Sequence, residues 1–179
     1  QVGSKNQSVR SAMIVGSGEI THYLCAEIKK SKMNIKIIES DYARCDEISS
    51  SFPHVTVVHG DTTNQELMAA EGIGRVGAFL ALSDSDEENM ILSMHAKEKT
   101  KGKIITKVTR IDYDSVIDRL DLDTVIYPKT IVSDMILRFV RSANNTRGSN
   151  METLYNVIKG EVEASEFFIR KPSPIVGVP

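Results

Sequence analysis

A short apolar strand signal that runs into two glycines constrains the fold of this chain more than any other stretch. Residues 11–22 read Ser-Ala-Met-Ile-Val-Gly-Ser-Gly-Glu-Ile-Thr-His, so a buried strand at 12–15 leads through a glycine turn into a helix. Gly16 permits the tight turn, and Gly18 lets the backbone approach a pyrophosphate at the positive end of the helix. Two glycines alone are a weak signal, so the prediction depends on the strands and side chains further along the chain. The predicted dinucleotide site begins with Gly16, Ser17, Gly18, Glu19 and Ile20.

The third position of the G-x-G-x-x-G pattern is Thr21 rather than glycine. Glycine at this position usually allows close packing between the helix and the strand. We therefore expect the Cβ of Thr21 to push the first helix outward and to retune binding. A small residue here does not exclude a nucleotide.

Strand and helix signals alternate through the first two thirds of the chain. Near-continuous apolar strands that alternate with helices are typical of a parallel sheet covered on both faces. We predict an α/β fold, a Rossmann-like doubly wound parallel six-stranded sheet. The predicted strands are 12–15, 35–39, 55–58, 78–82, 104–108 and 124–127, and the predicted helices are 20–30, 43–52, 64–71, 87–99 and 112–120.

The pattern changes after Pro128. Residues 130–142 predict one strongly amphipathic helix, although the six-stranded sheet is complete without it. Its apolar face either packs back on the sheet edge or serves as a crossover or dimer helix. A polar linker is predicted at 144–150, and strand-like alternation over 154–169 predicts a second, β-containing lobe. The apolar face comprises Ile131, Met135, Ile136, Phe139 and Val140.

These signals predict four segments. Residues 1–10 are a linker or a cloning remnant, and 11–129 form the Rossmann domain. Residues 130–146 form the crossover or dimerisation helix, and 147–179 are the truncated start of the small C-terminal lobe. The first residue is Gln rather than Met, so we expect the sequence to be a piece of a longer protein.

Composition argues against several classes of protein. A net charge of -2, the absence of Trp and an aromatic content of 6% give no reason to expect nucleic-acid binding. No apolar run approaches the roughly 18 residues of a membrane span. Cys25 and Cys45 fall on predicted helices without metal-type spacing, which favours reduced thiols in a cytosolic protein. No metal site is expected, because the histidines share no ligand spacing.

A carboxylate ends the second predicted strand. Glu39 lies 21 residues after Gly18, where a carboxylate can accept hydrogen bonds from an adenosine ribose diol. It would also repel a 2′-phosphate, which favours NAD over NADP. The alternative is an ordinary solvated acid at a strand end.

Polar residues also follow the third and fourth predicted strands. The carboxyl ends of parallel strands share one rim, where ligands of open α/β sheets bind. Asp61 is placed to bond the adenine amino group, and Ser83 to contact a phosphate or ribose. The alternative role is capping of the next helices, and the two roles can coexist. These candidates are Asp61, Thr62, Ser83 and Asp84.

No acid, base or nucleophile lies convincingly beside the expected nicotinamide position. The one Tyr-x-x-x-Lys pattern, Tyr155 to Lys159, falls in a segment of strand-like alternation, so its side chains share no helical face. The sequence therefore predicts a binding site without catalytic residues.

Together these residues resemble the TrkA-type RCK (regulator of potassium conductance) domains. The resemblance covers about residues 11–179 and is nearest to the second nucleotide-binding half of the Trk potassium-uptake regulators. Residues 126–140 are similar to the family's crossover, and residues 161–168 to the start of its C-terminal lobe. The stretches that carry it are Ile-Val-Gly-Ser-Gly-Glu-Ile, the Glu39 strand end, His59-Gly60-Asp61 and, most specifically, Ser83-Asp84-Ser85-Asp86-Glu87-Glu88-Asn89.

The resemblance implies a non-enzymatic, cytoplasmic regulatory subunit of a bacterial potassium-uptake system. Such subunits are peripheral at the inner face of the membrane and form homo-oligomers, dimers or tetramer rings, beneath a potassium-transporting membrane subunit. It also implies that NAD or NADH, or another adenine nucleotide such as ATP, binds at residues 16–20 with Glu39 on the ribose. Asp61, Thr62, Ser83 and Asp84 complete the site with a basic residue after the fifth strand. Lys107 best fits that basic position, and Arg110 is the runner-up.

Two other functions stay open. The chain is alternatively an RCK domain of a ligand-gated potassium channel or of an antiporter. A third reading is an NAD-dependent oxidoreductase, which would need catalytic residues outside this sequence.

Overall fold

The structure is a computed structural model that describes residues 9–29, 31, 33–144, 151–158 and 162–167. The chain divides into two compact units, residues 1–128 and 129–179. The predictions made for residues 1–8, 145–150 and 168–179 lie outside the described residues.

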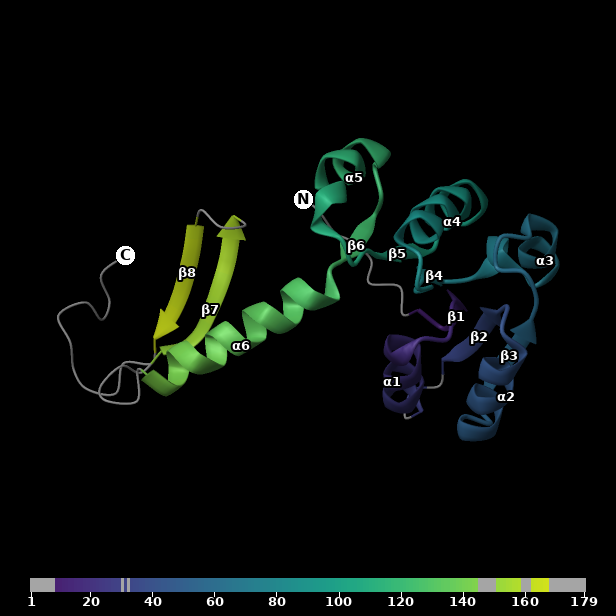
Figure 1. The fold of residues 1–179 in the computed structure, drawn as a ribbon, viewed down its shortest axis with the longest axis horizontal. Coiled ribbons are helices and arrows are strands. Elements are labelled where there is room, and N and C mark those ends of the chain that lie inside the picture. Colours follow the sequence, from purple (N-terminus) through teal and green to yellow (C-terminus); the bar gives the residue numbers. More distant parts are fainter. Residues whose placement is uncertain (1–8, 30, 32, 145–150, 159–161, 168–179) are drawn as a thin grey trace. The chain divides into compact units, whose positions relative to one another are not determined.

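The first unit is an open sheet in the order β3-β2-β1-β4-β5-β6 (Figure 1). Every neighbouring pair of strands is parallel, which confirms the predicted Rossmann-like architecture. The strands are β1 (Ser11–Val15), β2 (Asn34–Glu39), β3 (Val55–His59), β4 (Ala78–Ala81), β5 (Lys103–Lys107) and β6 (Thr124–Ile126). The helices are α1 (Glu19–Ile28), α2 (Tyr42–Ser51), α3 (Gln65–Ala70), α4 (Asp86–Lys99) and α5 (Asp114–Leu120), with 3-10 turns η1 (Ile73–Arg75) and η2 (Ile111–Tyr113).

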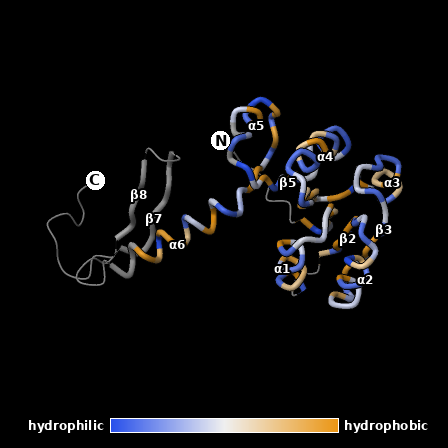
Figure 2. The backbone as a smooth tube through the Cα atoms, in the orientation of Figure 1, coloured by the Kyte–Doolittle hydropathy of each residue, from blue (hydrophilic) through white to orange (hydrophobic). Residues whose placement is uncertain are grey.

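The sheet is buried on both faces. Ile14 of β1 packs in one core cluster with Cys25 of α1, while the neighbouring Met13 packs in another with Met68 of α3. Helices α1 and α2 cover one face, and α3 and α4 cover the other (Figure 1). Successive strand residues point to opposite faces, so a strand covered on both sides is apolar at every position. Figure 2 shows this concentration of hydrophobic residues in the strands.

The thiols of Cys25 and Cys45 are free and buried, and burial raises the pKa of each.

The chain order reverses beside β1, which lies between β2 and β4. The amide of Leu82 donates to the Val15 carbonyl at 2.8 Å, which continues the β1–β4 ladder to the strand ends. Ligands of open α/β sheets bind outside the carboxyl ends at such a switch point. The glycine turn after β1 and the loop after β4 therefore meet at the place where a ligand is expected.

The described residues of the second unit form helix α6 (Pro128–Asn144), which begins at the last residue of the first unit, and the antiparallel pair β7 (Met151–Ile158) and β8 (Val162–Phe167). Helix α6 starts earlier than the predicted 130–142, because proline at the first turn loses no intrahelical hydrogen bond. It also includes Asn144, which was wrongly assigned to the polar linker. The strand-like alternation predicted over 154–169 corresponds to these two strands, and residues 159–161, 168 and 169 of that stretch lie outside the described residues.

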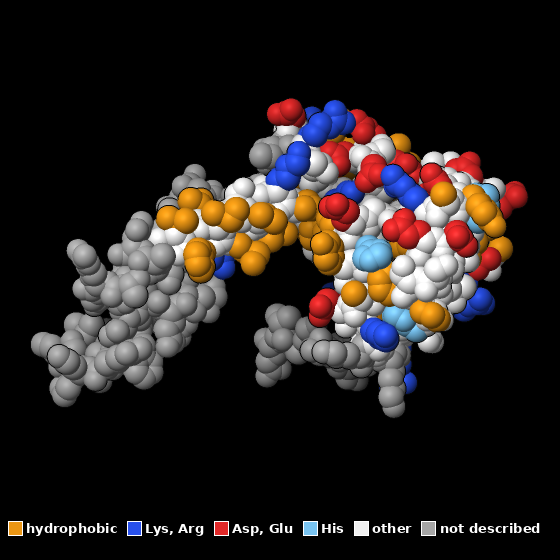
Figure 3. All heavy atoms as spheres, turned by 60° about the horizontal axis from the view of Figure 1, so that its bottom comes forward, with side chains coloured by type: hydrophobic (Ala, Val, Ile, Leu, Met, Phe, Trp, Pro, Cys, Tyr) orange, Lys and Arg blue, Asp and Glu red, His pale blue; other side chains and the backbone are white. Residues whose placement is uncertain are grey.

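Helix α6 exposes a row of hydrophobic side chains (Figure 3). Phe139 is the most exposed of them, at 76%. No helix in the described part of the chain is long and apolar enough to cross a membrane. The exposed hydrophobic residues of α6 are Ile131, Val132, Met135, Ile136, Leu137, Phe139 and Val140.

Candidate nucleotide-binding site

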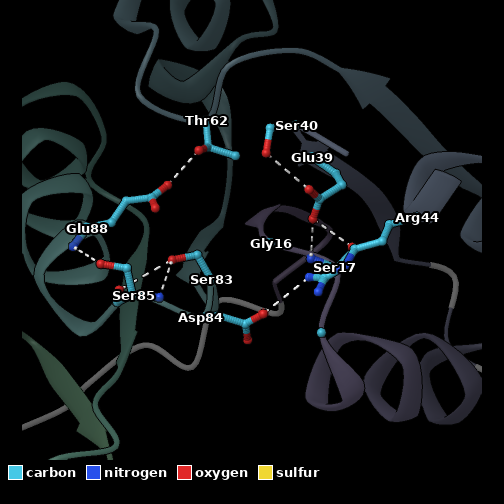
Figure 4. Close-up of a pocket in the computed structure, with 11 residues that line it drawn as sticks. Gly16, Ser17, Glu39, Ser40, Arg44, Thr62, Ser83, Asp84, Ser85 and Glu88 are labelled. Carbon is cyan, nitrogen blue, oxygen red and sulfur yellow. Dashed lines mark hydrogen bonds and ion pairs between the residues drawn. The ribbon is translucent and has the colours of Figure 1, made fainter. Parts of the chain in front are cut away.

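A pocket of about 410 Å³ lies at the carboxyl ends of β1, β2 and β4 (Figure 4). Its walls are the turn after β1, the start of α2, the loop after β3 and the first turn of α4. A second hollow of about 460 Å³ adjoins it along the start of α1. The residues that line the first pocket are Gly16, Ser17, Gly18, Glu39, Ser40, Arg44, Thr62, Ser83, Asp84, Ser85 and Glu88.

Gly16 fixes how closely the β1 turn approaches the β4 loop. Its φ is +93°, and a Cβ placed on it would lie 2.6 Å from Ser83 Cα and 2.7 Å from Ser83 N. A side chain at this position would be both strained and in collision with backbone. The two loops are therefore in direct backbone contact across Gly16.

Gly18 plays a different part. It is the N-cap of α1 with an ordinary φ of -65°, and no side chain among the described residues caps the helix there. A Cβ on Gly18 would meet Asp84 Oδ1 at 3.5 Å, an ordinary contact distance. The first-turn N–H groups and the positive end of α1 can therefore receive an anion. Glu19 lines the second hollow, while the Ile20 side chain packs against the core. The N–H groups of both residues lie in the first turn of α1, where the helix itself supplies no acceptor.

Thr21 is fully buried below the glycine turn. Its hydroxyl donates a hydrogen bond of 2.8 Å to the Gly16 carbonyl. The threonine that replaces the third glycine thus satisfies its own polar group and ties the first turn of α1 to the β1 turn.

Glu39 is 5% exposed at the end of β2, so the alternative of an ordinary solvated acid is wrong. Its Oε2 accepts from Ser17 N at 2.9 Å and from Ser17 Oγ at 2.6 Å, and its Oε1 accepts from Asp41 N at 2.8 Å. Burial alone raises the pKa of this carboxyl, but the hydrogen bonds from Ser17, Asp41 and Ser40 outweigh it and lower the pKa. Glu39 is therefore an ionised acceptor fixed beside the glycine turn (Figure 4).

Asp84 lies on the opposite wall and is held by two cations. Its Oδ2 is 3.2 Å from Arg44 Nη1, and its Oδ1 is 3.6 Å from Lys107 Nζ. The hydrogen bond with Asp84 raises the pKa of Arg44. Lys107, the predicted basic residue, thus lies near the pocket. The runner-up Arg110 pairs instead with Glu87 and Asp86.

A buried amide side chain joins the ends of β4 and β5. Asn89 is fully buried, donates to the carbonyls of Ser83 at 3.0 Å and Lys107 at 3.1 Å, and accepts from Ser83 N at 2.8 Å. Asp86, 4% exposed, accepts from the backbone amides of residues 109 and 110, each at 2.9 Å. Asp86 and Asn89, at the start of α4, therefore hold the loops after β4 and β5.

The loop after β3 contributes one of its two predicted residues to the pocket. Thr62 lines it and donates to Glu88 Oε1 at 2.5 Å. Asp61 does not line this pocket, and its carboxylate accepts from Thr63 N at 2.8 Å and Thr63 Oγ1 at 2.7 Å, which lowers its pKa.

Helix capping does not explain the four polar residues that end β3 and β4. Asn64 caps α3, and Ser85 caps α4. The capping alternative for Asp61, Thr62, Ser83 and Asp84 is therefore wrong.

Four lining residues were missed from the sequence, namely Ser40, Arg44, Ser85 and Glu88. Arg44 could have been found from the sequence, because it lies in the first turn of the helix that follows Glu39 and is therefore near the predicted site. Ser85 and Glu88 have capping-box spacing, which predicts that the glutamate bonds back to the cap. Glu88 bonds Thr62 across the pocket instead (Figure 4). Among the described residues, no cluster of His, Cys, Asp and Glu could hold a metal ion.

The arrangement suits a ribose on one side and a phosphate on the other. Glu39 is an ionised acceptor for hydroxyl groups, and the uncapped start of α1 with Arg44 and Lys107 suits an anion. The pocket also carries Asp84 and Glu88, so its negative groups outnumber its cations.

Comparisons with known proteins agree with this fold. The TrkA-N domain family model matches residues 12–128. The Trk system potassium uptake protein trkA homolog 1 of Methanosarcina mazei is 28% identical over 178 residues, which is 99% of this chain and 42% of that protein. The Trk system potassium uptake protein TrkA of Vibrio alginolyticus is 30% identical over 157 residues, 88% of this chain and 33% of that protein. The chain thus spans less than half the length of these relatives.

Solved structures share the fold at low sequence identity. The TrkA-N domain of the inner membrane protein ybaL from Escherichia coli matches with a TM-score of 0.65 at 20% identity, over 74% of this chain and 97% of that one. The GsuK channel bound to NAD matches with a TM-score of 0.60 at 17% identity, over 86% of this chain and 26% of that one. Because the family model covers more than half of the sequence, the chain belongs to the TrkA-N domain family.

Proposed function

We propose that this chain is the nucleotide-binding regulatory domain of a potassium-transport system and that its ligand is NAD or NADH. One observation carries the proposal: the ionised Glu39 carboxylate is fixed 2.9 Å from Ser17 N, within the glycine turn that leads into an uncapped helix. A ribose acceptor and an anion site side by side are the two halves of a dinucleotide site.

The proposed ligand contacts come from the pocket walls. The backbone of residues 16–20 receives the pyrophosphate, and Glu39 accepts from the ribose hydroxyls. The loops after β3 and β4 complete the site through Thr62 and Ser83, with Asp61 and Asp84 in the same two loops and Lys107 as the nearby cation. The negative charge of Glu39 disfavours a 2′-phosphate, so we expect NADPH to bind more weakly than NAD or NADH.

The proposed mechanism is regulation by binding rather than catalysis. A nucleotide that contacts the β1 turn and the loops after β3 and β4 favours one arrangement of those loops. Shifting a two-state equilibrium from 1:99 to 99:1 needs about 5.5 kcal/mol of differential affinity. A ring of several copies can sum smaller contributions.

The proposed partners are a potassium-transporting membrane subunit and further copies of this chain, at the cytoplasmic face of the membrane. The names of the potassium-uptake relatives support the membrane subunit as a partner.

The proposed segments are the Rossmann domain at 11–129, a crossover helix at 130–146 and a C-terminal lobe from 147. The exposed Phe139 supports contact between subunits. Phe139→Asp is expected to lower the dimer population in sedimentation runs, and an unchanged population would exclude this role for α6.

A potassium channel domain is the second candidate function. The likeness to the GsuK channel, TM-score 0.60, favours it. The full-length gene distinguishes the two: a pore segment in the same chain indicates a channel, and its absence from the complete gene indicates a separate regulatory subunit. Hydride transfer to any candidate substrate would instead indicate an oxidoreductase.

Calorimetric titration of the 179-residue chain with NADH, NAD, ATP and NADPH tests the proposal. We expect NAD or NADH to bind, NADPH to bind more weakly, and Glu39→Ala to lose binding. Glu98→Ala removes an exposed carboxylate of α4 and is the matched control, with unchanged affinity. No binding by any nucleotide, or equal affinity in Glu39→Ala, would contradict the proposed site.

A further inference from the structure

The Asp84 carboxylate lies where the proposed site is best suited to an anion. Its oxygens are 3.2 Å from Arg44 Nη1 and 3.6 Å from Lys107 Nζ. Asp84 Oδ1 is also 3.5 Å from a Cβ built on Gly18, so it lies beside the N-cap of α1. Three features that attract anions converge on a side chain of the protein itself.

These features are the ones that bind a diphosphate. The N-terminus of a helix attracts negative charge, and guanidinium and ammonium groups form charge-assisted hydrogen bonds with phosphate oxygens. The Lys107 side chain is only 11% exposed, so an anion beside its ammonium offsets part of the cost of burying that charge. An anion is needed at this position whether or not a ligand supplies it.

Asp84 itself is free to leave. Its side chain is 68% exposed in the loop between β4 and α4. The pair with Arg44 joins two exposed side chains, and such pairs contribute about 0–1 kcal/mol, so little of that contact's energy is lost when the carboxylate turns into water. The phosphate that replaces Asp84 then supplies the anion beside Lys107. Figure 4 shows that Asp84 and Glu39 come from different walls of the pocket.

Building on the proposed function, we propose that Asp84 is an internal competitor of the nucleotide. Its carboxylate occupies the phosphate position between Arg44, Lys107 and the start of α1, and it must move before a diphosphate enters. Asp84 therefore lowers the affinity for the nucleotide and sets the concentration at which the site fills. Because Glu39 lies on the other wall, the competition acts on the phosphate and leaves nucleoside binding unchanged.

The substitution Asp84→Asn tests this competition, because it keeps the shape of the side chain and removes its charge. ADP and adenosine are titrated into the 179-residue chain by calorimetry. We expect the Kd for ADP to fall about 3- to 10-fold, from lost repulsion and freed cations, while the Kd for adenosine stays the same. Asp84→Glu keeps the charge and is expected to remain near the wild type. Asp118→Asn removes an equal charge from the exposed face of α5 and changes neither Kd.

The double variant Asp84→Asn, Arg44→Gln isolates the shared cation. We expect a smaller gain for Asp84→Asn in the Arg44→Gln background, since one of the two cations it would release is gone. If the wild type binds ADP and Asp84→Asn binds it equally or more weakly, Asp84 is not a competitor, and the proposed function stands. If neither protein binds ADP, NAD or NADH, the proposed function fails and the competition fails with it. If NAD or NADH binds and ADP does not, the competition alone fails.

Discussion

Two carboxylates face the same pocket in different ways. Glu39 is 5% exposed and accepts hydrogen bonds from Ser17 and Asp41, so its position is set by the backbone. Asp84 has a side chain that is 68% exposed and contacts long, flexible cationic side chains. The proposed nucleotide would find the first group already in place and would have to displace the second. One pocket therefore combines a rigid recognition wall with an adjustable one.

The difference predicts that the backbone framework carries stability and the Asp84 contacts do not. Gly16→Ala is expected to lower the free energy of unfolding by about 4 kcal/mol, from left-handed strain and overlap with the Ser83 backbone. Gly18→Ala is the matched control, because the φ of Gly18 is ordinary and a Cβ there meets only Asp84 Oδ1. This variant should lower the free energy of unfolding by less than about 1 kcal/mol. Urea unfolding measures both. Equal losses of unfolding free energy in the two variants would show that the Ser83 backbone moves aside to accept a Cβ at position 16.

The second largest effect is expected at the buried amide behind the β4 loop. Asn89→Ala leaves the buried polar groups of Ser83 and Lys107 without their partner and should cost about 3 kcal/mol. Asn64→Ala, an identical change at the exposed N-cap of α3, should cost about 1 kcal/mol. If thermal unfolding finds the two variants equally stable, Asn89 does not hold the strand ends together.

Glu39→Gln tests the rigid wall through its pH dependence. The substitution is expected to cost about 2 kcal/mol at pH 7, because Ser17 and Asp41 lose an ionised acceptor. The pKa of Glu39 is lowered in the folded state, so its contribution is complete above the ordinary glutamate pKa of about 4.3 and is lost as the pH falls below it.

Chemical unfolding of both proteins between pH 3 and pH 7 measures this difference. The two stabilities should converge toward acid pH. Glu98→Gln, at an exposed position of α4, is the matched control. A cost independent of pH would mean that the charge of Glu39 is not what the Ser17 contacts stabilise.

The smallest effect is expected at the adjustable wall. Arg44 pairs with Asp84 while both side chains are largely exposed, so Arg44→Gln should change the free energy of unfolding by less than about 0.5 kcal/mol. A loss as large as that of Glu39→Gln in the same urea titration would remove the contrast between the two walls.

The sequence was sufficient for the sheet because its signals are local. Apolar runs, glycine turns and cap residues gave the six strands, and the spacing from Gly18 led to Glu39. The contacts of Arg44 and Asn89 were missed because they join distant segments: Arg44 meets a carboxylate 40 positions later, and Asn89 reaches the end of β5. A side chain's partner across the sheet depends on tertiary packing, which periodicity does not encode.

The missing side chain at Gly16 also decides which parts of the pocket can move independently. The turn after β1 touches the Ser83 backbone directly. The backbone of these two central loops therefore moves as one unit, and no gap between them can open or close. Displacement by the proposed ligand is left to the side chains of Asp84 and Arg44 and to the loop after β3 with Thr62. A movement caused by the proposed ligand would therefore start at the rim of the sheet, while the backbone at its centre stays fixed.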